Sequence, residues 1–331
     1  MNTLPPLRFE RHFVEKVWGG RRLAERPGID LPDRMQVGET WEVVDREKEN
    51  SRVAEGPFAG RTLHELMLEH GPAILGKNQG RRDGRFPLLV KFLDASDDLS
   101  VQVHPDDALA ERLGDGSEGK TEAWYVVDVA EGGALYAGLD PKVTAEYFRS
   151  VADKREVEDT LVRHDVKAGD CVLITGGTVH AIGKGVTILE VQQNSDTTYR
   201  LWDWGRVGLD GKPRETHVEQ GLVCTKFGAE PPSPHAGVWM PNGTGFKAEL
   251  TTSDYFSMTA HRVGSRLAIE GDDRFRIHVV LSGRGALTAE AFGNQRFELA
   301  PGTTYLVPAS TGAHEIVAEG GELSLVELGG A

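Results

Sequence analysis

The feature that most constrains this chain is a series of short apolar segments that glycine residues separate. Forty of the 331 residues are glycine, and the segments between them are rich in Val, Ile, Leu and Thr, which favour strands. The segments that we expect to be strands are FPLLVKFLDA, EAWYVVDVA, DCVLIT, VTILEVQQ and FRIHVVLSGRGALTAEAF. Many short strands with little helix between them predict an antiparallel sandwich or barrel, so the expected fold class is mostly β.

Helical periodicity is confined to three short segments. In TLHELMLEHG, Thr62 and Glu65 form a capping box, and Gly71 is expected to end the helix. The other two candidate helices are TAEYFRSVAD near 144–153 and HVEQGLV near 217–223.

A proline-rich linker and a weak internal repeat indicate two related β-domains. FGAEPPSPHAG at 227–237 holds three prolines, which interrupt both helices and central strands. VKAGDCVLITGGTVHAI, 166–182, has a counterpart in LAPGTTYLVPASTGAHEI, 299–316. In the second copy His314 stands one position later than the spacing of His180 predicts. On a strand, this slip would turn the side chain to the opposite face, so the first copy is the better place for a metal.

The composition excludes some classes of protein. The net charge of −14 argues against a nucleic-acid or anionic-membrane surface, so a phosphate site would need a local cluster of Lys and Arg. No apolar run reaches the length of a membrane span, and the first residues lack the apolar core of a signal peptide. Cys171 and Cys224 show neither metal-type spacing nor the framework of a secreted protein, although one disulfide stays possible. We expect a cytoplasmic protein with no obligate protein partner.

Four polar side chains in strand-like segments form a candidate metal site. In LSVQVHPDD, Gln102 and His104 share one face because strand residues alternate. Glu122 lies in GKTEAWYV, which reads as the next strand, and His180 ends a predicted GDCVLITGGTVH hairpin. Two imidazoles, a carboxylate and an amide oxygen suit Zn²⁺ or a similar divalent ion. The alternative for any one histidine is a hydrogen-bonded structural role.

This combination resembles the cupin superfamily, whose second motif reads G-x5-P-x-G-x2-H. Here Gly169, Gly177 and His180 fit that spacing, and Thr175 stands where the motif has proline. The substitution affects the rigidity of the turn rather than metal ligation.

A closer resemblance is to the short bacterial form of the type I mannose-6-phosphate isomerases. It is carried by PLLVKFLDASDDLSVQVHPDD, GKTEAWYV, GTVHAIGKG and LEVQQNSDTTYRLWDWGR, with VWGG and VGETWEV near the N-terminus. The resemblance implies two cupin-type jelly-roll β-barrels or sandwiches with a few short helices. The N-terminal domain, 1–230, would be catalytic and hold one divalent metal ion, expected to be Zn²⁺. The C-terminal domain, 235–331, would be a cupin-like domain without metal.

The resemblance further implies an aldose–ketose isomerase that interconverts mannose 6-phosphate and fructose 6-phosphate by proton transfer through a cis-enediol. It assigns Gln102, His104, Glu122 and His180 as metal ligands, Lys120, Glu190, Asp196 and Arg200 as catalytic residues, and Lys91, Ser100 and Arg206 as phosphate-binding residues. Lys120 also stands two residues before Glu122, so on a strand it would face the same way. Lys91 and Ser100 flank the turn DASDD, on strands that could pair as a hairpin.

Ordinary structural roles compete with these assignments. Lys120 could be a solvated surface residue, Asp196 a turn cap, and Arg200 a partner of Asp203, while Lys91 and Arg206 could form surface ion pairs. Trp18, Glu39 and Trp41 belong to matching motifs without an assigned step, and core packing is the expected role of the two tryptophans.

Two other functions compete with the isomerase. A non-catalytic cupin could bind a sugar phosphate as a sensor, but such a protein would not need Lys120, Glu190 and Arg200 beside a full ligand set. An iron-dependent cupin oxygenase is disfavoured by Gln102, because Fe(II) sites generally use imidazoles and a carboxylate.

Overall fold

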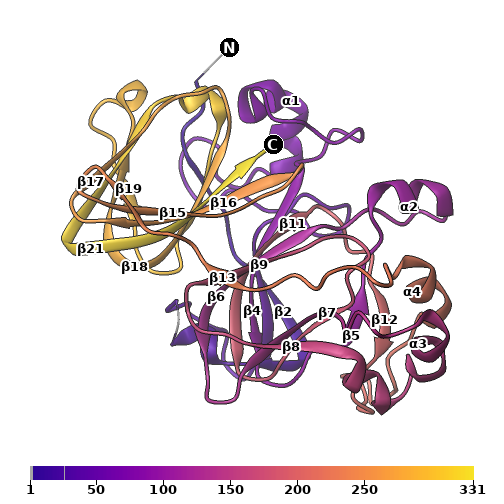
Figure 1. Ribbon diagram of the computed structural model, residues 1–331. Helices are drawn as coiled ribbons and strands as arrows, with labels where there is room; N and C mark the ends of the chain where they lie inside the picture. The colour runs from indigo at the N-terminus through magenta and orange to yellow at the C-terminus, as the bar shows by residue number, and fades with distance from the viewer. Residues whose placement is uncertain (1–2, 26) are drawn as a thin grey trace.

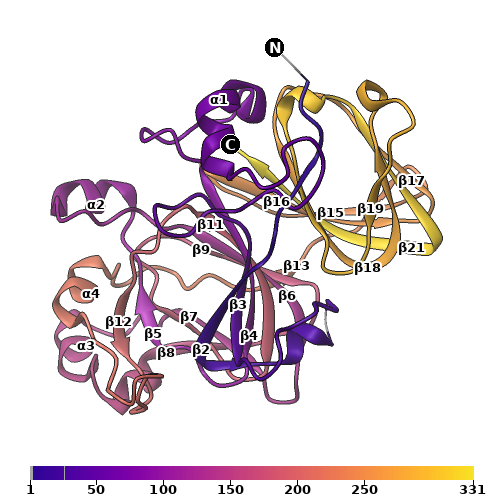
Figure 2. The ribbon, with the colours of Figure 1, turned by 180° about the vertical axis from the view of Figure 1, so that it is seen from behind.

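The computed structural model describes residues 3–25 and 27–331, and the chain is mostly β, as predicted. Figure 1 shows two groups of strands, with the C-terminal strands in orange and yellow gathered beside the rest of the chain, and Figure 2 shows the same arrangement from behind.

Two antiparallel sheets make the larger group of strands. The first sheet has the order β13 (His235–Ala236), β9 (Asp170–Ile174), β6 (Glu122–Val129), β11 (Val186–Gln193), β4 (Leu88–Ala95), β3 (Val37–Val43), β2 (His12–Gly20). The second has the order β12 (Tyr199–Trp202), β5 (Val101–Val103), β10 (His180–Ile182), β7 (Ala134–Leu139), β8 (Leu161–Asp165). Their facing side chains form one apolar cluster that includes Trp124, Val126, Leu135, Ile174 and Ile182. The two sheets therefore pack as a sandwich.

Two predicted hairpins are wrong, because the chain changes sheets at both places. β9 pairs with β6, whereas β10 pairs with β5 and β7 in the other sheet. The chain crosses between them at Gly177, which has a φ of +92° and donates its backbone N–H to the carbonyl of His104 at 2.7 Å. β4 and β5 likewise belong to different sheets, so Lys91 on β4 and Ser100, just before β5, are not paired along a ladder.

The helices largely follow their sequence signals. α1 (Leu63–Leu75) begins with the predicted capping box at Thr62, but it continues through Gly71 and Pro72. Its end lies at Gly76, where φ is +58° and the backbone is in close contact with Asp273, so only a residue without a side chain fits. The predicted helices near 144–153 and 217–223 are confirmed as α3 (Ala145–Val151) and α4 (Val218–Cys224).

A fourth helix, α2 (Asp107–Leu113), follows directly after the candidate ligand His104 and was not predicted. Asp106 caps its first turn, accepting the N–H of Leu109 at 2.9 Å, and Gly114 ends it in the left-handed conformation. Both signals are present in HPDDALAERLGDG.

The C-terminal strands, joined by β1 (Leu7–Arg8) from the N-terminal segment, form one long curled sheet. Its main path is β1, β20 (Thr304–Val307), β18 (Arg276–Thr288), β21 (His314–Gly330), β16 (Phe256–Val263), β15 (Gly245–Thr252), β14 (Met240–Asn242), with β17 (Arg266–Ile269) on β21 and β19 (Phe297–Leu299) on β18. Its inner face holds a separate apolar cluster that includes Val280, Leu287, Ile316 and Leu325. The opposite face joins the core shared with the first sandwich, where Ile277 and Leu306 lie in one cluster with Val90 and Leu189.

The prediction that the extra residue turns the His314 side chain to the opposite face of its strand is wrong. His314 is buried, and on β21 it stands two residues before Ile316 of the inner cluster. Its Nδ1 lies 3.1 Å from the carbonyl oxygen of Gly312, just as Nδ1 of His180 lies 2.9 Å from that of Thr178. The extra residue is taken up by the short 3-10 turn η4 (Ala309–Thr311) before the strand starts.

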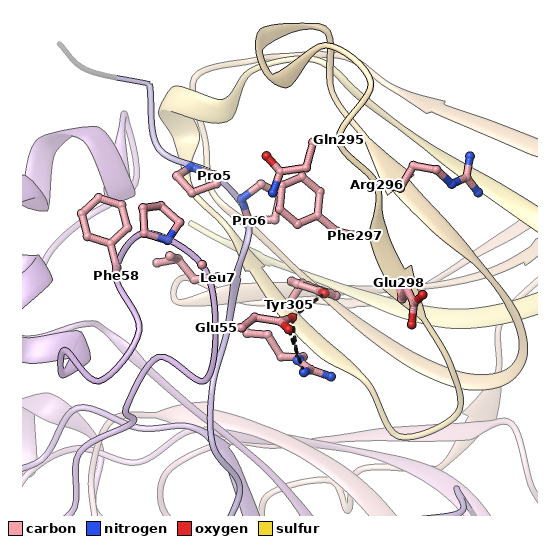
Figure 3. A pocket seen from close by; sticks show the side chains of 13 residues that line it. Pro5, Pro6, Leu7, Glu55, Phe58, Gln295, Arg296, Phe297, Glu298 and Tyr305 are labelled. Carbon is pink, nitrogen blue, oxygen red and sulfur yellow. Dashed lines mark hydrogen bonds and ion pairs between the residues drawn. The ribbon is translucent and has the colours of Figure 1, made fainter.

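The N-terminal segment lies against the C-terminal sheet through β1, and a cavity of about 360 Å³ lies beside this contact (Figure 3). The Tyr305 hydroxyl donates to Glu55 at 3.3 Å, and Arg8 pairs with the same carboxylate at 2.9 Å.

Cys171 and Cys224 are buried and unpaired. Within residues 3–25 and 27–331, no helix is long and apolar enough to cross a membrane.

Candidate metal centre

Three of the four predicted ligands converge between the two sheets of the first sandwich. His104 directly follows β5, Glu122 begins β6, and His180 begins β10. The distance from His104 Nε2 to Glu122 Oε2 is 3.6 Å, and that from His180 Nε2 to Glu122 Oε1 is 3.4 Å. One ligand atom from each residue lies within 4.8 Å of the others, and all three residues are buried.

Backbone carbonyls orient both imidazoles. His104 Nδ1 lies 2.8 Å from the carbonyl oxygen of Thr197, and His180 Nδ1 lies 2.9 Å from that of Thr178. Because a carbonyl oxygen only accepts, each Nδ1 carries the proton and each Nε2 presents a lone pair to the site. Burial lowers the pKa of both histidines, which keeps the imidazoles neutral, as metal ligation requires.

Glu122 is held ionised by its neighbours. Burial alone would raise its pKa, but Lys120 and the two histidines bring the pKa below the usual value. Nζ of Lys120 lies 2.7 Å from Glu122 Oε2 and 3.2 Å from His104 Nε2. Lys120 is only 5% exposed, so the alternative of a solvated surface lysine does not describe it.

Gln102 is the fourth candidate ligand, and its position in the β5–β10 ladder brings it to the other three. It lies directly opposite His180 in the β5–β10 ladder, and its Nε2 is 3.2 Å from His180 Nε2. A half-turn of the amide about its terminal bond places the oxygen there instead. The donor set is thus two neutral imidazoles, one carboxylate and one amide, which fits a borderline divalent ion such as Zn²⁺.

A cavity of about 310 Å³ opens onto these residues from one side. Its lining includes eight of the predicted site residues, namely Lys91, Ser100, Gln102, Lys120, Glu122, Glu190, Asp196 and Arg200. His104 and His180 lie behind the lining, almost entirely buried.

A chain of alternating charges forms one wall of the cavity. Lys16 pairs with Glu39 at 3.2 Å, and Lys91 lies 3.8 Å from Glu39 and 3.0 Å from Glu190. Burial raises the pKa of Glu190 to about 7, helped by the nearby Glu122 and opposed by Lys91. Burial also acts on Glu39, but Lys91 and Lys16 lower its pKa to about 2. The two carboxyl groups therefore differ: Glu39 stays ionised, whereas Glu190 can gain and lose a proton near neutral pH.

Three residues with expected surface or turn roles can now be placed. Lys91 is 8% exposed and its ion pairs are buried, so it is not a surface lysine. Arg200 donates to the carbonyl of Glu215 at 2.8 Å rather than pairing with Asp203. Asp196 lies at the rim, where its largely exposed carboxylate pairs with Arg46 at 3.0 Å.

Arg206 lies outside the cavity lining. Its guanidinium pairs with Asp203 at 2.9 Å and with Asp97 at 3.4 Å. The arginine that lines the cavity beside Arg200 is Arg214, which donates its Nε to Asp203 at 2.7 Å. Asp203 thus links the two guanidinium groups.

Several lining residues were not predicted from the sequence, among them Lys16, Thr198 and Arg214. Arg214 comes from the turn GKPRETH, which contains no pattern that marks a site. Trp18 is in the sandwich core, as expected, and also lines the cavity. Trp41 is half-buried instead of packed in the core, and its Nε1 donates to Glu39 at 2.7 Å.

Comparison with known proteins decides the family. The family description "Phosphomannose isomerase type I, catalytic domain" matches residues 7–128, and "Mannose-6-phosphate isomerase, cupin domain" matches residues 247–326. Mannose-6-phosphate isomerase ManA of Bacillus subtilis is 34% identical over 314 residues, covering 95% of this chain and 96% of the relative. The chain belongs to the type I phosphomannose isomerase family.

Further relatives of this isomerase family agree over nearly the whole chain. Mannose-6-phosphate isomerase of Streptococcus mutans is 34% identical over 303 residues, which is 92% of both chains. The crystal structure of the mannose 6-phosphate isomerase from Bacillus subtilis superposes with a TM-score of 0.88 at 31% identity, over 98% of this chain and 99% of that one. The protein is therefore an isomerase of cupin fold, as the resemblance implied.

Proposed function

We propose that this isomerase interconverts mannose 6-phosphate and fructose 6-phosphate by a metal-dependent transfer of a proton between C2 and C1 through a cis-enediol. The observation that carries the proposal is one cavity in which a His–Glu–His ligand set borders a carboxyl group of near-neutral pKa and several cationic side chains. The reaction needs a base, charge stabilisation for the enediolate and an anchor for the phosphate, and this cavity offers groups for each.

We assign the metal to His104, Glu122, His180 and Gln102, and expect one Zn²⁺ per chain. When bound, the ion supplies a Lewis acid that orients sugar oxygens and offsets negative charge as the enediolate forms. Three of these residues, His104, Glu122 and His180, are buried, and the Thr197 and Thr178 carbonyls fix two neutral imidazoles.

Glu190 is the proposed base for the proton at C2. It is 2% exposed, its pKa of about 7 lies near the optimum for proton exchange at neutral pH, and Lys91 balances its charge when ionised. Lys120 and Asp196 are further proton-transfer candidates, from inside the cavity and from its rim, and Arg200 is the candidate for stabilising the enediolate.

The phosphate is proposed to bind at the arginine side of the cavity. Arg214 lines it there, and a guanidinium suits a phosphate dianion, while Arg200 keeps the enediolate role. Lys91 and Ser100 lie on the same cavity, while Arg206 would act through Asp203, which also holds Arg214. Arg214→Gln should then raise KM for the sugar phosphate more than Arg206→Gln, and equal effects of both variants would contradict this order.

Isomerisation with and without metal tests the function. Purified protein should form fructose 6-phosphate from mannose 6-phosphate, lose this activity after chelation, and regain it with Zn²⁺. Binding of the sugar phosphate without turnover would favour the sensor instead. A cytoplasmic location and the lack of nucleic-acid, membrane or obligate protein partners stay predictions from composition.

A further inference from the structure

The orientation of the candidate ligand His104 depends on a backbone carbonyl that lies in a loop. This acceptor, the oxygen of Thr197, belongs to the segment 194–198 between β11 and β12. The loop lies outside the strand ladders, although its Asn194 and Ser195 N–H groups donate to the carbonyls of Pro87 and Gln193 at 2.9 and 2.7 Å, and the Gln192 amide donates to the Ser195 carbonyl at 2.6 Å. The atoms that fix this loop therefore decide how firmly His104 points its Nε2 into the site.

Hydrogen bonds tie the loop to the segment that leads into β6. The backbone N–H of Glu118 donates to Thr197 Oγ1 at 2.9 Å, and the Ser195 hydroxyl donates to the Glu118 carbonyl at 3.1 Å. The Asn194 side chain, 1% exposed, donates to the carbonyls of Asp45 and Phe86 at 2.7 and 2.8 Å.

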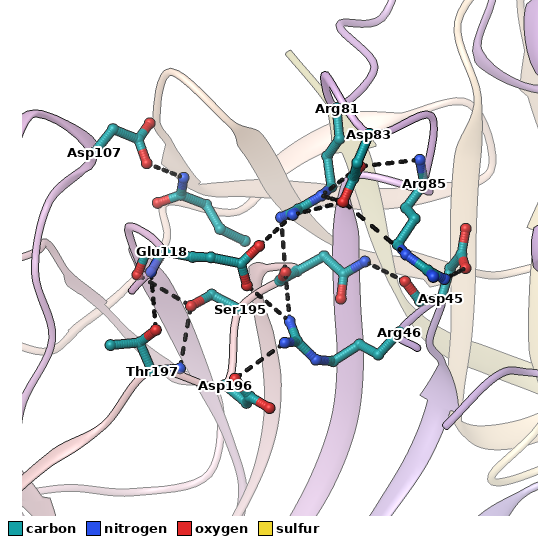
Figure 4. Close-up of polar contacts among 12 residues, drawn as sticks. Asp45, Arg46, Arg81, Asp83, Arg85, Asp107, Glu118, Ser195, Asp196 and Thr197 are labelled. Atoms are coloured by element: carbon teal, nitrogen blue, oxygen red, sulfur yellow. Dashed lines mark hydrogen bonds and ion pairs between the residues drawn. The ribbon is translucent and has the colours of Figure 1, made fainter. Parts of the chain in front are cut away.

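Two arginines from outside the cavity close this arrangement (Figure 4). Arg46 and Arg81 each donate to the carbonyl oxygen of Asn194 at 2.8 Å. Both also pair with the carboxylate of Glu118, Arg46 at 3.1 Å and Arg81 through its Nη2. Arg46 pairs with Asp196 as well, at 3.0 Å. The side chains of Arg46 and Arg81 are 17% and 24% exposed, so solvent screens these contacts only in part.

We propose that Arg46 and Arg81, through Glu118 and the Asn194 carbonyl, are positioning residues for the metal ligand His104. Each guanidinium spans the loop and the β6 lead-in at once, which a single ammonium group cannot do as well. Neither arginine touches the ligand atoms or lines the catalytic cavity. The proposal rests on the metal site of the proposed function.

The test is the affinity of the full-length protein for Zn²⁺, measured by competition with a chelator. The double variant Arg46→Gln/Arg81→Gln should bind Zn²⁺ about tenfold or more weakly, the size typical when the support of a ligand is lost. The visible absorption of bound Co²⁺ should change too, because His104 is then less fixed. The unfolding free energy of each metal-free variant is measured alongside.

Arg85→Gln is the matched control. Arg85 belongs to the same group of charges and pairs with the buried Asp45 at 2.9 Å. It also lies 4.0 Å from Asp83, a partner of Arg81, but no hydrogen bond or ion pair joins it to Glu118 or to the loop 194–198. It should lose stability and keep its Zn²⁺ affinity within about twofold. If the double variant does not fold, Thr197→Val removes only the hydroxyl that accepts from Glu118, and it should weaken Zn²⁺ binding in the same direction.

Three results would overturn the positioning role. One is Zn²⁺ affinity in the double variant, or in Thr197→Val if that replaces it, within twofold of wild type. Another is an equal loss in Arg85→Gln, which would indicate general loosening. Absence of Zn²⁺ binding by the wild-type chain would overturn the metal site as well, whereas an active, metal-binding wild type beside unchanged variants overturns this proposal alone.

Discussion

Glu190 and Glu39 show how two carboxyl groups that pair with the same lysine, Lys91, can take different roles. Both lie within 4 Å of Lys91, and both are buried. Glu39 has a second cation in Lys16 and the indole N–H of Trp41, whereas Glu190 has the negative Glu122 nearby. The surroundings therefore separate their pKa values, to about 2 and about 7.

This difference predicts unequal effects of two matched substitutions. Glu190→Gln removes the proposed base, so kcat should fall by about 100-fold or more, while the metal content stays at the wild-type value. Glu39→Gln removes a charge from the same lysine but no proton acceptor, and its kcat should fall far less. Steady-state kinetics with metal analysis checks both, and an unchanged kcat in Glu190→Gln would contradict the assignment.

At the residue scale, the sequence predicts those candidate site residues that stand in a recognisable motif. Gln102, His104, Glu122 and His180 stand in four short segments that can be compared one at a time. Arg46 and Arg214 stand in segments without such a pattern. Arg46 contacts Glu118 and Asn194, which lie far along the chain, and Arg214 lines the cavity from a turn. Long-range contacts of this kind depend on the finished fold, so a local pattern does not reveal them.

At the scale of elements, α1 shows which signals are strong. Its capping box is complete: Thr62 Oγ1 accepts from the N–H of Glu65 at 3.2 Å, and the Glu65 carboxylate accepts from the N–H of Thr62 at 2.7 Å. Gly71 did not end the helix, because a glycine inside a helix costs only about 1 kcal/mol and the buried face continues to Ile74.

Removing the cap at Thr62 should cause a measurable loss of stability. Thr62→Ala removes the acceptor for one N–H of the first turn and should lower the free energy of unfolding by about 1 kcal/mol. Urea denaturation measures this value, with Thr62→Ser, which keeps the hydroxyl, as the control. Equal stability of Thr62→Ala and wild type would show that the cap contributes nothing.

Strands were easier to predict than their partners. The segments around β4, β6, β9, β11 and β18 were expected from composition, because strand-forming residues are a local property. The pairing of β9 with β6 and of β10 with β5 was not, since a sandwich lets successive strands lie in opposite sheets. The candidate ligands nevertheless lie close together, because both sheets face the same interior.

At the scale of the whole molecule, the first sandwich and the curled C-terminal sheet share a plan but differ in the residues at corresponding positions. The β18–β20 register places Arg276 opposite Val307, as the β6–β9 register places Glu122 opposite Ile174. His314 corresponds to His180, but its ladder partner is Ile269, where His180 has Gln102. A guanidinium in place of the carboxylate repels a cation, which supports the prediction of a C-terminal domain without metal.

Acid should lower the stability of the C-terminal sheet. His314 and His278 lie with their Nε2 atoms 2.9 Å apart, and burial lowers the pKa of both and that of His261, the last to about 4. Unfolding returns each to about 6.5. Below pH 6.5 these histidines bind more protons in the unfolded chain than in the folded one. Their contribution to the free energy of unfolding is therefore complete above pH 6.5 and is lost as the pH drops toward 4.

Removing one of these histidines should flatten this dependence. For His261→Gln, the loss of unfolding free energy between pH 6.5 and 4 should be smaller than in wild type by up to about 3 kcal/mol. Urea denaturation at several pH values measures it, and the exposed His235, replaced in the same way, is the control. Identical pH profiles for wild type and His261→Gln would rule out this origin of acid sensitivity.

The most direct test is the number of Zn²⁺ ions bound per chain, measured by elemental analysis after dialysis, together with turnover of mannose 6-phosphate. We expect one ion in the wild type, none and no turnover in His180→Ala, and one ion with turnover in His314→Ala. A full equivalent of Zn²⁺ in His180→Ala, or isomerisation that survives the loss of the metal, would contradict a catalytic metal held in the first sandwich.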